Sequence, residues 1–266
     1  MGASDPAEEE ELVLSRSGPV ARILFNRPAR RNAMTLRMWG ALHRALLSLA
    51  DDDAVRVIVL AGAGGAAFVS GADIGEFDRL RATPEGVAEY NRVSDDAETA
   101  LYQCPKPTIA EIDGFCMGGG LGIAVACDLR IASTRAQFGI PAGRLGLAYG
   151  YDSVARLVAL LGPSVAAEIL FTAVLLPAER AQNVGLLNAI VAPELLGERV
   201  AATAAQIAAN APMTLRAAKA AIGAATAASV DRTAVEALIA ACYASADYAE
   251  GRRAFAERRA PRFVGR

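Results

Sequence analysis

Two different spacings of apolar residues alternate along the first two thirds of the chain. Short apolar runs rich in β-branched residues have the length and composition of buried strands, and the segments between them have helical spacing. In one such segment the apolar residues follow Thr35, a suitable helix cap. This order predicts an α/β fold with strands buried on at least one face. The predicted strands are Val20 to Phe25, Val55 to Leu60, Pro107 to Ile112 and Leu129 to Ala132.

The pattern changes after about Pro193, where Ala-rich segments follow one another without strand signals. Breaks at residues 210–212 and near residues 229–231 divide this part into three or four predicted helices. We therefore predict a core over residues 12–193 and a helical C-terminal region over residues 194–266. Because no long Gly/Ser or Pro linker separates the two parts, we expect them to pack tightly.

Composition and charge narrow the class of protein. Of the 266 residues, 53% are hydrophobic and 21% charged, enough to bury one large core. The formal net charge is −2 and the basic residues are scattered, which argues against nucleic-acid binding. Residues 1–11 end in the acidic run Glu8 to Glu11 and predict a flexible tail rather than a secretory signal. No stretch of about 18 residues is both apolar and free of charge, so we expect a cytoplasmic protein with no membrane contact.

The residues that most often hold metals or act as nucleophiles are few. His43 is the single histidine and lies in the helical pattern after Thr35, so a structural role is predicted for it. A single histidine makes a Ser-His-Asp triad or a His-rich metal site hard to assemble. The cysteines stand in apolar company without a CxxC pair, so we expect reduced packing residues, not zinc ligands or disulfides: Cys104, Cys116, Cys127 and Cys242.

Two glycine-rich turns each follow a predicted strand. The first includes Phe68 to Ile74, and the second runs from Asp113 to Gly122 and contains three consecutive glycines. Where such a turn leads into a helix, free backbone N–H groups and the positive end of the helix dipole favour an anion. The spacing fits neither a dinucleotide fingerprint nor a P-loop, and a lone glycine run is more often a tight packing turn.

Taken together, the motifs make a more specific pattern. In order along the chain they are Asn26-Arg27-Pro28, Asn32-Ala33-Met34, Gly71-Ala72-Asp73-Ile74, Gly118-Gly119-Gly120, Cys127-Asp128, Phe138-Gly139-x-Pro141 and the closing Phe255-x-x-x-Arg259-x-Pro261-x-Phe263-x-Gly265-Arg266. This series resembles the crotonase (enoyl-CoA hydratase/isomerase) superfamily from about Leu12 to Arg266. The resemblance implies a spiral of ββα units, a C-terminal trimerisation region, and a homotrimer or a dimer of trimers.

The resemblance also implies a site for an acyl-CoA thioester. The N–H groups of Ala72 and Gly119 would form an oxyanion hole for the thioester oxygen, which becomes negative when an enolate forms. Coenzyme A would arrive as part of the substrate, with no separate cofactor and no metal. The residues implied to contact the CoA moiety or the substrate are Ala29, Ser70, Asp73, Ile74, Gly75 and Gly118.

The chain departs from the family at the two positions where a hydratase carries its catalytic glutamates. Gly122 stands three residues after the middle glycine of the run, and Ala142 follows the proline of the FGxP motif. Neither residue transfers a proton, so hydration by two carboxylates is not supported by the matched positions. An isomerase with one glutamate at either position is disfavoured for the same reason.

Side chains that could take the place of the two missing glutamates lie between Leu145 and Ser153. Tyr149 falls where methylmalonyl-CoA decarboxylases, whose LGxPY segment this one resembles, keep a tyrosine, and Asp152 is the nearest carboxylate. Alternatively Tyr149 packs the turn and Asp152 caps a helix from Ser153 to Leu161. Glu111 and Asp113 flank the glycine turn, but a Glu before a turn is more often a surface or interface charge. Asp95, Asp96 and Glu98 either line the substrate entrance or form a solvated helix face. The polar stretch Asp78 to Tyr90 is expected to be a flexible insertion that walls the site.

These observations predict an acyl-CoA lyase that forms a thioester enolate. One alternative is decarboxylation of a malonyl-type thioester, where the loss of CO₂ generates the same enolate without a strong base. There Tyr149 would orient the leaving carboxylate in an apolar pocket facing no cation. The others are a true enoyl-CoA hydratase despite the missing glutamates and a catalytically silent acyl-CoA-binding subunit.

Overall fold

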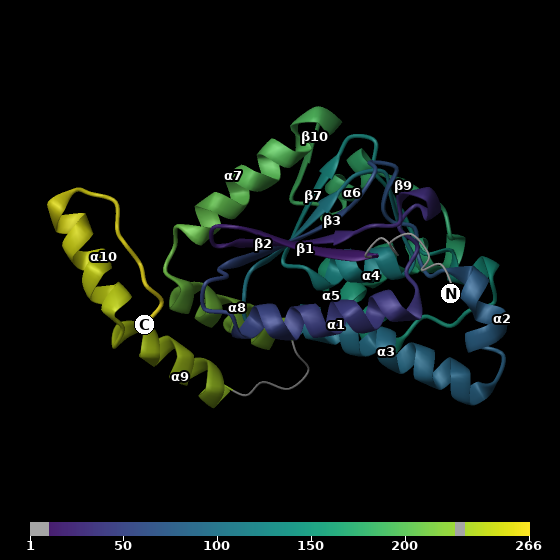
Figure 1. Ribbon diagram of the computed structural model, residues 1–266, viewed down its shortest axis with the longest axis horizontal. Coiled ribbons are helices and arrows are strands. Elements are labelled where there is room, and N and C mark those ends of the chain that lie inside the picture. The colour runs from purple at the N-terminus through teal and green to yellow at the C-terminus, as the bar shows by residue number, and fades with distance from the viewer. Residues whose placement is uncertain (1–10, 227–231) are drawn as a thin grey trace, which may run out of the picture.

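The computed structural model describes residues 11–226 and 232–266, and within them the strands form two sheets (Figure 1). The larger sheet has the order β1-β2-β3-β5-β7-β10, and the smaller has the order β4-β6-β8-β9. The strands are β1 (Leu12–Ser17), β2 (Val20–Phe25), β3 (Val57–Gly62), β4 (Ala67–Val69), β5 (Thr108–Ile112), β6 (Phe115–Met117), β7 (Leu129–Ser133), β8 (Gln137–Gly139), β9 (Leu176–Pro177) and β10 (Ala189–Val191).

Helices connect these strands and cover the sheets. The α-helices are α1 (Leu36–Asp51), α2 (Phe77–Leu80), α3 (Pro84–Gln103), α4 (Gly119–Ala126), α5 (Tyr151–Thr172), α6 (Ala178–Asn183), α7 (Leu196–Ala208), α8 (Pro212–Thr226), α9 (Arg232–Tyr243) and α10 (Ala246–Glu257). Short 3₁₀ turns are η1 (Pro28–Arg30), η2 (Ile74–Glu76), η3 (Pro141–Arg144) and η4 (Pro193–Leu195).

The chain alternates between the two sheets in repeated units. β3 leads to β4 and then α3, β5 leads to β6 and then α4, and β7 leads to β8 and then α5. Within each sheet the successive strands of these units are parallel, as crossover connections require. This arrangement confirms the predicted α/β spiral of ββα units.

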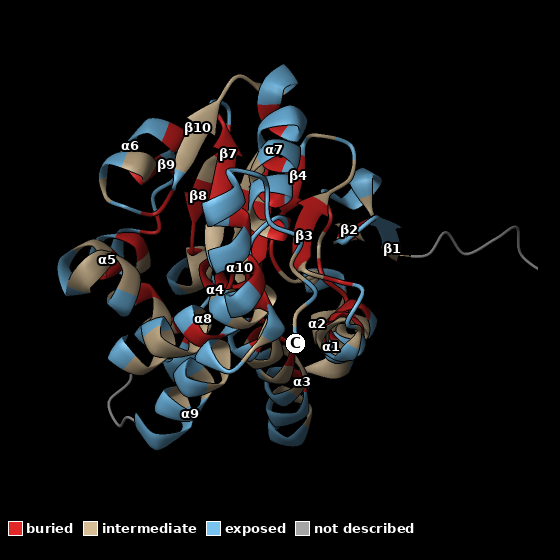
Figure 2. Ribbon diagram, turned by 90° about the vertical axis from the view of Figure 1, so that its left-hand side faces the viewer, coloured by how far each residue is buried: buried red, intermediate tan, exposed pale blue. Residues whose placement is uncertain are grey.

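Both faces of the larger sheet are buried at its central parallel strands β3, β5 and β7, as expected for parallel strands rich in Val and Ile. On β3, Val57 and Val59 belong to the apolar cluster with α7, whereas Ile58 and Leu60 belong to the main core, which includes buried residues of α1, α3 and α4. Figure 2 shows the buried residues concentrated along these strands. The sheet therefore fixes the ends of β3 and β5, from which the chain continues into the two glycine-rich turns.

The long helices and strands agree with the sequence prediction, whereas some of their boundaries differ from it. Thr35 caps α1, since its hydroxyl accepts a hydrogen bond from the N–H of Met38 at 3.1 Å, as predicted. Residues 78–90, predicted as a flexible insertion, are largely helical. That segment is α2 and the start of α3, because Thr83 caps α3 through the N–H of Gly86 and Pro84 occupies the first helical position.

The N-terminal prediction falls largely outside the described residues, which begin at Glu11. Glu11 itself is held in place: its carboxylate lies 3.2 Å from Nε of Arg27 and accepts a hydrogen bond from the Thr35 hydroxyl at 3.0 Å. These contacts tie the start of β1 to the segment that leads into α1.

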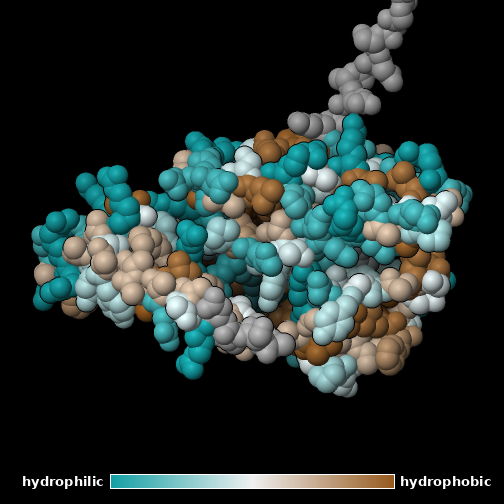
Figure 3. Space-filling model, turned by 90° about the horizontal axis from the view of Figure 1, so that it is seen from below, coloured by the Kyte–Doolittle hydropathy of each residue, from teal (hydrophilic) through white to brown (hydrophobic). Residues whose placement is uncertain are grey.

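The C-terminal region consists of α7 to α10 and a closing extended segment. The predicted break at residues 210–212 is confirmed, because α7 ends at Ala208 and α8 begins at Pro212; the break predicted near residues 229–231 lies outside the described residues. α9 and α10 project from the body and carry hydrophobic side chains among hydrophilic ones (Figures 1 and 3). Glu250 holds the closing motif by accepting hydrogen bonds from Arg259 at 2.6 Å and from the N–H of Arg262 at 2.9 Å.

Among the described residues, α5 alone has the length and hydropathy of a membrane-spanning helix. It carries Arg156 and Glu168, and it is interrupted at Gly162, where φ is 75° just before Pro163. Arg156 stacks over the ring of Tyr102 on α3, so this end of α5 is part of the body of the protein. Length and composition alone are weak evidence of a membrane span.

Candidate active site

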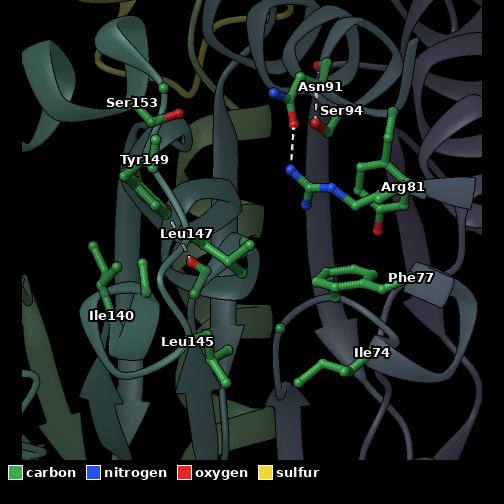
Figure 4. A pocket seen from close by; sticks show the side chains of 18 of the residues that line it. Ile74, Phe77, Arg81, Asn91, Ser94, Ile140, Leu145, Leu147, Tyr149 and Ser153 are labelled. Carbon is green, nitrogen blue, oxygen red and sulfur yellow. Dashed lines mark hydrogen bonds between the residues drawn. The ribbon is translucent and has the colours of Figure 1, made fainter. Parts of the chain in front are cut away.

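One cavity of about 200 Å³ lies where both glycine-rich turns meet α3 and the loop before α5 (Figure 4). Its walls come from five segments of the chain: Trp39 on α1, residues 70–74, residues 77–98, residues 118–119, and residues 140–153. Ile140, Leu145, Leu147 and Tyr149 form one wall, and Ile74, Phe77 and Arg81 form the opposite one. The cavity is therefore largely apolar with a few polar groups, which is typical of a small-molecule site.

The first glycine-rich turn is fixed by an isolated parallel bridge between Met34 and Ala72. The N–H of Met34 donates to the carbonyl of Gly71, and the N–H of Asp73 donates to the carbonyl of Met34, both at 2.8 Å. Ala72 lies between these two bonds, and its N–H donates to no described residue. That N–H is therefore available to a ligand in the cavity that Ala72 lines.

The second turn places Gly119 as the first residue of α4, where no earlier turn of helix accepts its N–H. Gly118 precedes it with φ 50° and ψ −120°, a backbone conformation that favours glycine. A Cβ atom on Gly118 would lie 3.7 Å from Cα of Gly71, so the two turns are in contact. The structure thus brings Ala72 and Gly119 together at one cavity, as the oxyanion-hole prediction requires.

Tyr149 acts on this turn through the backbone. Its ring lines the cavity, and its hydroxyl donates a hydrogen bond to the carbonyl of Gly118 at 3.0 Å. That carbonyl and the N–H of Gly119 belong to the same peptide unit, so the bond orients the donor and polarises it. Burial, with the Glu98 carboxyl group as a further cause, raises the pKa of the Tyr149 hydroxyl well above its usual range, so it keeps its proton at neutral pH.

Gly122 and Ala142, the two positions where the resemblance implies glutamates in a hydratase, differ in their surroundings. Ala142 lines the cavity and leaves that part of it apolar. Gly122 is buried inside α4, and a Cβ atom there would overlap Oε1 of Glu98 and lie 2.9 Å from its Cδ. The space beside Gly122 is therefore filled by the carboxyl group of Glu98, which α3 contributes.

Glu98 is a functional candidate whose position becomes clear only in the structure. It lines the cavity although its side chain is only 6% exposed, and Oε2 accepts a hydrogen bond from the Ser153 hydroxyl at 2.6 Å. Nη1 of Arg156 is 3.4 Å from the same oxygen. Burial raises the pKa of Glu98 to about 7, against the opposing effects of Ser153 and Arg156. A carboxyl group with this pKa exchanges protons readily near neutral pH.

Of the two neighbouring acids on α3, one lines the cavity and the other lies on the solvated face of the helix. Asp95 lines the cavity, and its pKa is raised by partial burial and by the nearby charge of Asp152. Asp96 lies outside the cavity lining and pairs with Arg92 at 2.8 Å. The cluster is thus part cavity wall and part solvated helix face.

The remaining predicted acids lie away from the cavity. Asp152 is exposed in the first turn of α5 and is absent from the cavity lining. It does not cap a helix starting at Ser153, because α5 begins at Tyr151 with Gly150 as the cap residue. Glu111 is bound by both terminal nitrogens of Arg22 at 2.8 Å, and Asp113 accepts hydrogen bonds from Ser133 and Arg135 at 2.7 Å.

Of the residues expected near the CoA moiety or the substrate, Ser70, Ile74 and Gly118 line the cavity. Asp73 instead supports the turn: its Oδ2 lies 2.8 Å from Nη1 of Arg27, and its Oδ1 accepts a hydrogen bond from the N–H of Gly75 at 3.1 Å. Ala29 is exposed on η1. His43 lies on α1 outside the lining, and Cys104, Cys116 and Cys127 are buried free thiols that fill the interior, as predicted; Cys242 is partly buried.

The expectation that the pocket faces no cation is wrong. Arg81 lines the cavity opposite Tyr149, at the end of α2 (Figure 4). Its guanidinium lies over the rings of Phe77 and Tyr90 at 4.8 and 4.9 Å and donates to Asn91 at 2.9 Å. Residues 78–90 are the segment predicted to wall the site, but the placement of Arg81 in that wall depends on its contacts with Phe77, Tyr90 and Asn91.

The paired sheets, the repeated ββα units and the two adjoining glycine turns define a protein of the crotonase fold class. The chain belongs to the enoyl-CoA hydratase/isomerase family, whose model matches residues 15–266. A crotonyl-CoA hydratase from Syntrophomonas wolfei subsp. wolfei is 33% identical over 259 residues, which are 97% of this chain and 99% of that protein.

Solved structures agree with this assignment. An enoyl-CoA hydratase/carnithine racemase from Magnetospirillum magneticum is 37% identical and superposes with a TM-score of 0.91 over 97% of each chain. A putative enoyl-CoA hydratase/isomerase family protein from Hyphomonas neptunium is 34% identical, with a TM-score of 0.92 over 97% of this chain and 98% of that one. This protein is thus an acyl-CoA-processing member of the superfamily.

Proposed function

We propose that this protein is an acyl-CoA lyase that works through a thioester enolate. The observation that carries the proposal is the meeting of two unused backbone donors, the N–H groups of Ala72 and Gly119, at one largely apolar cavity. Negative charge develops on the thioester oxygen as the enolate forms, and donors fixed on the backbone stabilise that charge without rearranging. Coenzyme A enters as part of the substrate.

The reaction is tested with a panel of 2-enoyl-, 3-hydroxyacyl- and 2-carboxyacyl-CoA thioesters, followed by mass spectrometry of the products. We expect at least one member to gain or lose water, or to lose CO₂. The rate of this conversion should depend on the N–H of Ala72. Binding without turnover of any member would instead identify a catalytically silent acyl-CoA-binding subunit.

A second candidate is decarboxylation of a malonyl-type thioester, for which Arg81 supplies a binding group and not the cation-free pocket that was expected to promote the loss of CO₂. A guanidinium in the cavity wall binds a substrate that carries a carboxylate besides the thioester. After the loss of CO₂ the remaining enolate needs only a proton, which a protonated Glu98 supplies. Turnover restricted to 2-carboxyacyl-CoA, and lost in Arg81→Met, would select this reaction over addition or elimination of water.

We also propose assembly as a homotrimer or a dimer of trimers through the C-terminal region. Several large apolar side chains of α8, α9 and α10 are exposed in the single chain, a feature typical of a surface that a partner covers. They are Ile222, Ile239, Tyr243, Tyr248 and Phe255. Light scattering on the purified protein measures the mass: a monomer of 27.6 kDa would contradict the proposal.

A further inference from the structure

Gly122 and Glu98 form a complementary pair that spans two helices. The residue at 122 has no side chain, and the space beside it holds the carboxyl group of Glu98 from α3. A hydratase of this family carries a glutamate at the position of Gly122. In this chain the carboxyl group beside that position comes from α3 and not from α4, and it lines the cavity.

We infer that Glu98 is the catalytic acid–base of this site and takes the proton from C2 of the acyl-CoA. This inference rests on the proposed enolate-forming function and names the group that makes the enolate. In the step the C2–H bond breaks, the proton passes to the Glu98 carboxylate, and the electron pair moves onto the thioester oxygen between the N–H groups of Ala72 and Gly119. Return of the proton to C2 reverses the step, and its transfer to a leaving group at C3 completes an elimination.

The contacts of Glu98 suit this role. Both of its described polar partners, Ser153 and Arg156, approach Oε2, which anchors that oxygen. Among the described residues, none donates a hydrogen bond to Oε1. One oxygen is therefore anchored while the other is available for proton transfer, an arrangement expected of a general base.

The charged and titratable groups around Glu98 are few. Arg156 approaches from α5, Tyr149 from the preceding loop, Asp95 from the adjacent turn of α3, and Arg81 lies in the cavity wall. α4 contributes only glycine and aliphatic residues, and α1 contributes Trp39. Burial outweighs the charge of Arg156 and keeps the pKa of Glu98 near 7, so the carboxylate form appears as the pH rises through neutrality.

The test separates proton removal from the complete reaction. Butyryl-CoA has C2 protons but no double bond, hydroxyl group or second carboxylate, so an enolate-forming enzyme exchanges its C2 protons and does nothing else. Wild-type protein is incubated with butyryl-CoA in D₂O, and deuterium at C2 is measured by mass spectrometry. We expect exchange that rises with pH between about 5 and 8, and a loss of about 10²–10⁴-fold in Glu98→Gln.

Two further variants separate a catalytic role from a structural one. Asp96→Asn changes a carboxylate on the same helix that pairs with Arg92 outside the cavity, and it should exchange like wild type. Glu98→Ala combined with Gly122→Glu moves the carboxylate back to α4, and this double variant should recover exchange that Glu98→Ala lacks. If Glu98→Gln is poorly folded, recovery of exchange in the double variant still tests the role of the carboxylate, because that group is then supplied from another helix.

The outcomes are distinct. No exchange by wild type, equal exchange by wild type and Glu98→Gln, or a rate that falls with rising pH would overturn the assignment of Glu98. If a lyase reaction is found and proceeds unchanged in Glu98→Gln, the proposed function stands and the base is another group. If exchange depends on Glu98 but no thioester of the panel is converted, the assignment of Glu98 stands and the lyase proposal fails.

Discussion

Gly119 lies directly against the indole ring of Trp39. A Cβ atom on Gly119 would be 2.8 Å from Cζ2 and 3.3 Å from Cη2 of that ring, and the first of these distances is shorter than Cβ atoms show in folded proteins. Trp39 is 2% exposed and packs in the core, so displacing its ring costs packing contacts. Glycine at 119 is therefore required by packing as well as by the chemistry proposed for its N–H.

This contact predicts that Gly119→Ala lowers the free energy of unfolding by about 1–3 kcal/mol, the usual cost of overpacking a core. Urea unfolding measures the change. Because the added methyl group acts through the indole, the double variant with Trp39→Phe should lose less stability than the two single changes added together. The matched control is Gly197→Ala on α7, where nothing lies within 4 Å of the new methyl group and no loss is expected. A wild-type urea midpoint for Gly119→Ala would contradict the packing interpretation.

Ala72→Pro removes one oxyanion donor and leaves the hydrogen bonds that hold its turn in place. The bonds that hold this turn use the N–H groups of Met34 and Asp73, so both remain when the N–H of Ala72 is deleted. We expect kcat to fall by about 10²–10³-fold on whichever thioester is turned over. Ala72→Ser keeps the N–H and serves as the control. Full activity in a folded Ala72→Pro protein would show that this N–H is not a catalytic donor.

Hydration of crotonyl-CoA should be slow compared with a hydratase that has two carboxylates. One acid–base group typically contributes about 10²–10⁴-fold, and Ala142 leaves its part of the cavity without one. Ala142→Glu should therefore increase the rate at which the enoyl absorbance is lost. Gly143→Glu adds the same charge one residue further on, outside the cavity lining, and should have no such effect. Efficient hydration by wild type would show that Ala142 does not limit the reaction.

The raised pKa of Glu98 also predicts how stability depends on pH. Its rise from 4.5 to about 7 means that the folded protein favours the protonated form. The corresponding stabilisation is fully present below pH 4.5 and is lost as the pH rises through about 7. Between pH 4.5 and pH 8, the free energy of unfolding of the wild type should therefore fall by about 3 kcal/mol relative to that of Glu98→Gln. Urea unfolding across this range measures the difference, and a difference that does not change with pH would mean that Glu98 titrates normally.

The main strands and helices could be predicted because each is long enough to show its own spacing. β2 and β5 lie close to the predicted ranges, whereas β4, β6 and β8 have three residues each, too few for an alternating pattern to appear. Thr35 was identified because a cap is a local signal. The start of α5 was misplaced because Gly150 offers no side chain as a marker.

The candidate site was predictable where it depends on backbone and not where it depends on long-range packing. The run of glycines in the sequence indicates the turn at Gly118 and Gly119. The role of Gly122 is visible only in the structure, where Glu98 of another helix fills the space beside it. The missed signal was helical spacing: Tyr90, Ser94 and Glu98 are separated by four residues each and all line the cavity, so they share one face of α3.

Tyr149 gives the last prediction, because its hydroxyl is already committed to the carbonyl of Gly118. If it acts by orienting the peptide that carries the N–H of Gly119, Tyr149→Phe should lower kcat on every thioester the enzyme converts, and should also slow deuterium exchange into butyryl-CoA. The loss of one neutral hydrogen bond of about 1 kcal/mol corresponds to roughly a 5-fold decrease. If the hydroxyl instead holds a leaving carboxylate, the decrease should be confined to 2-carboxyacyl-CoA and exchange should be unaffected. Unchanged kcat/KM on all substrates would exclude both roles and leave the tyrosine ring as part of the cavity wall.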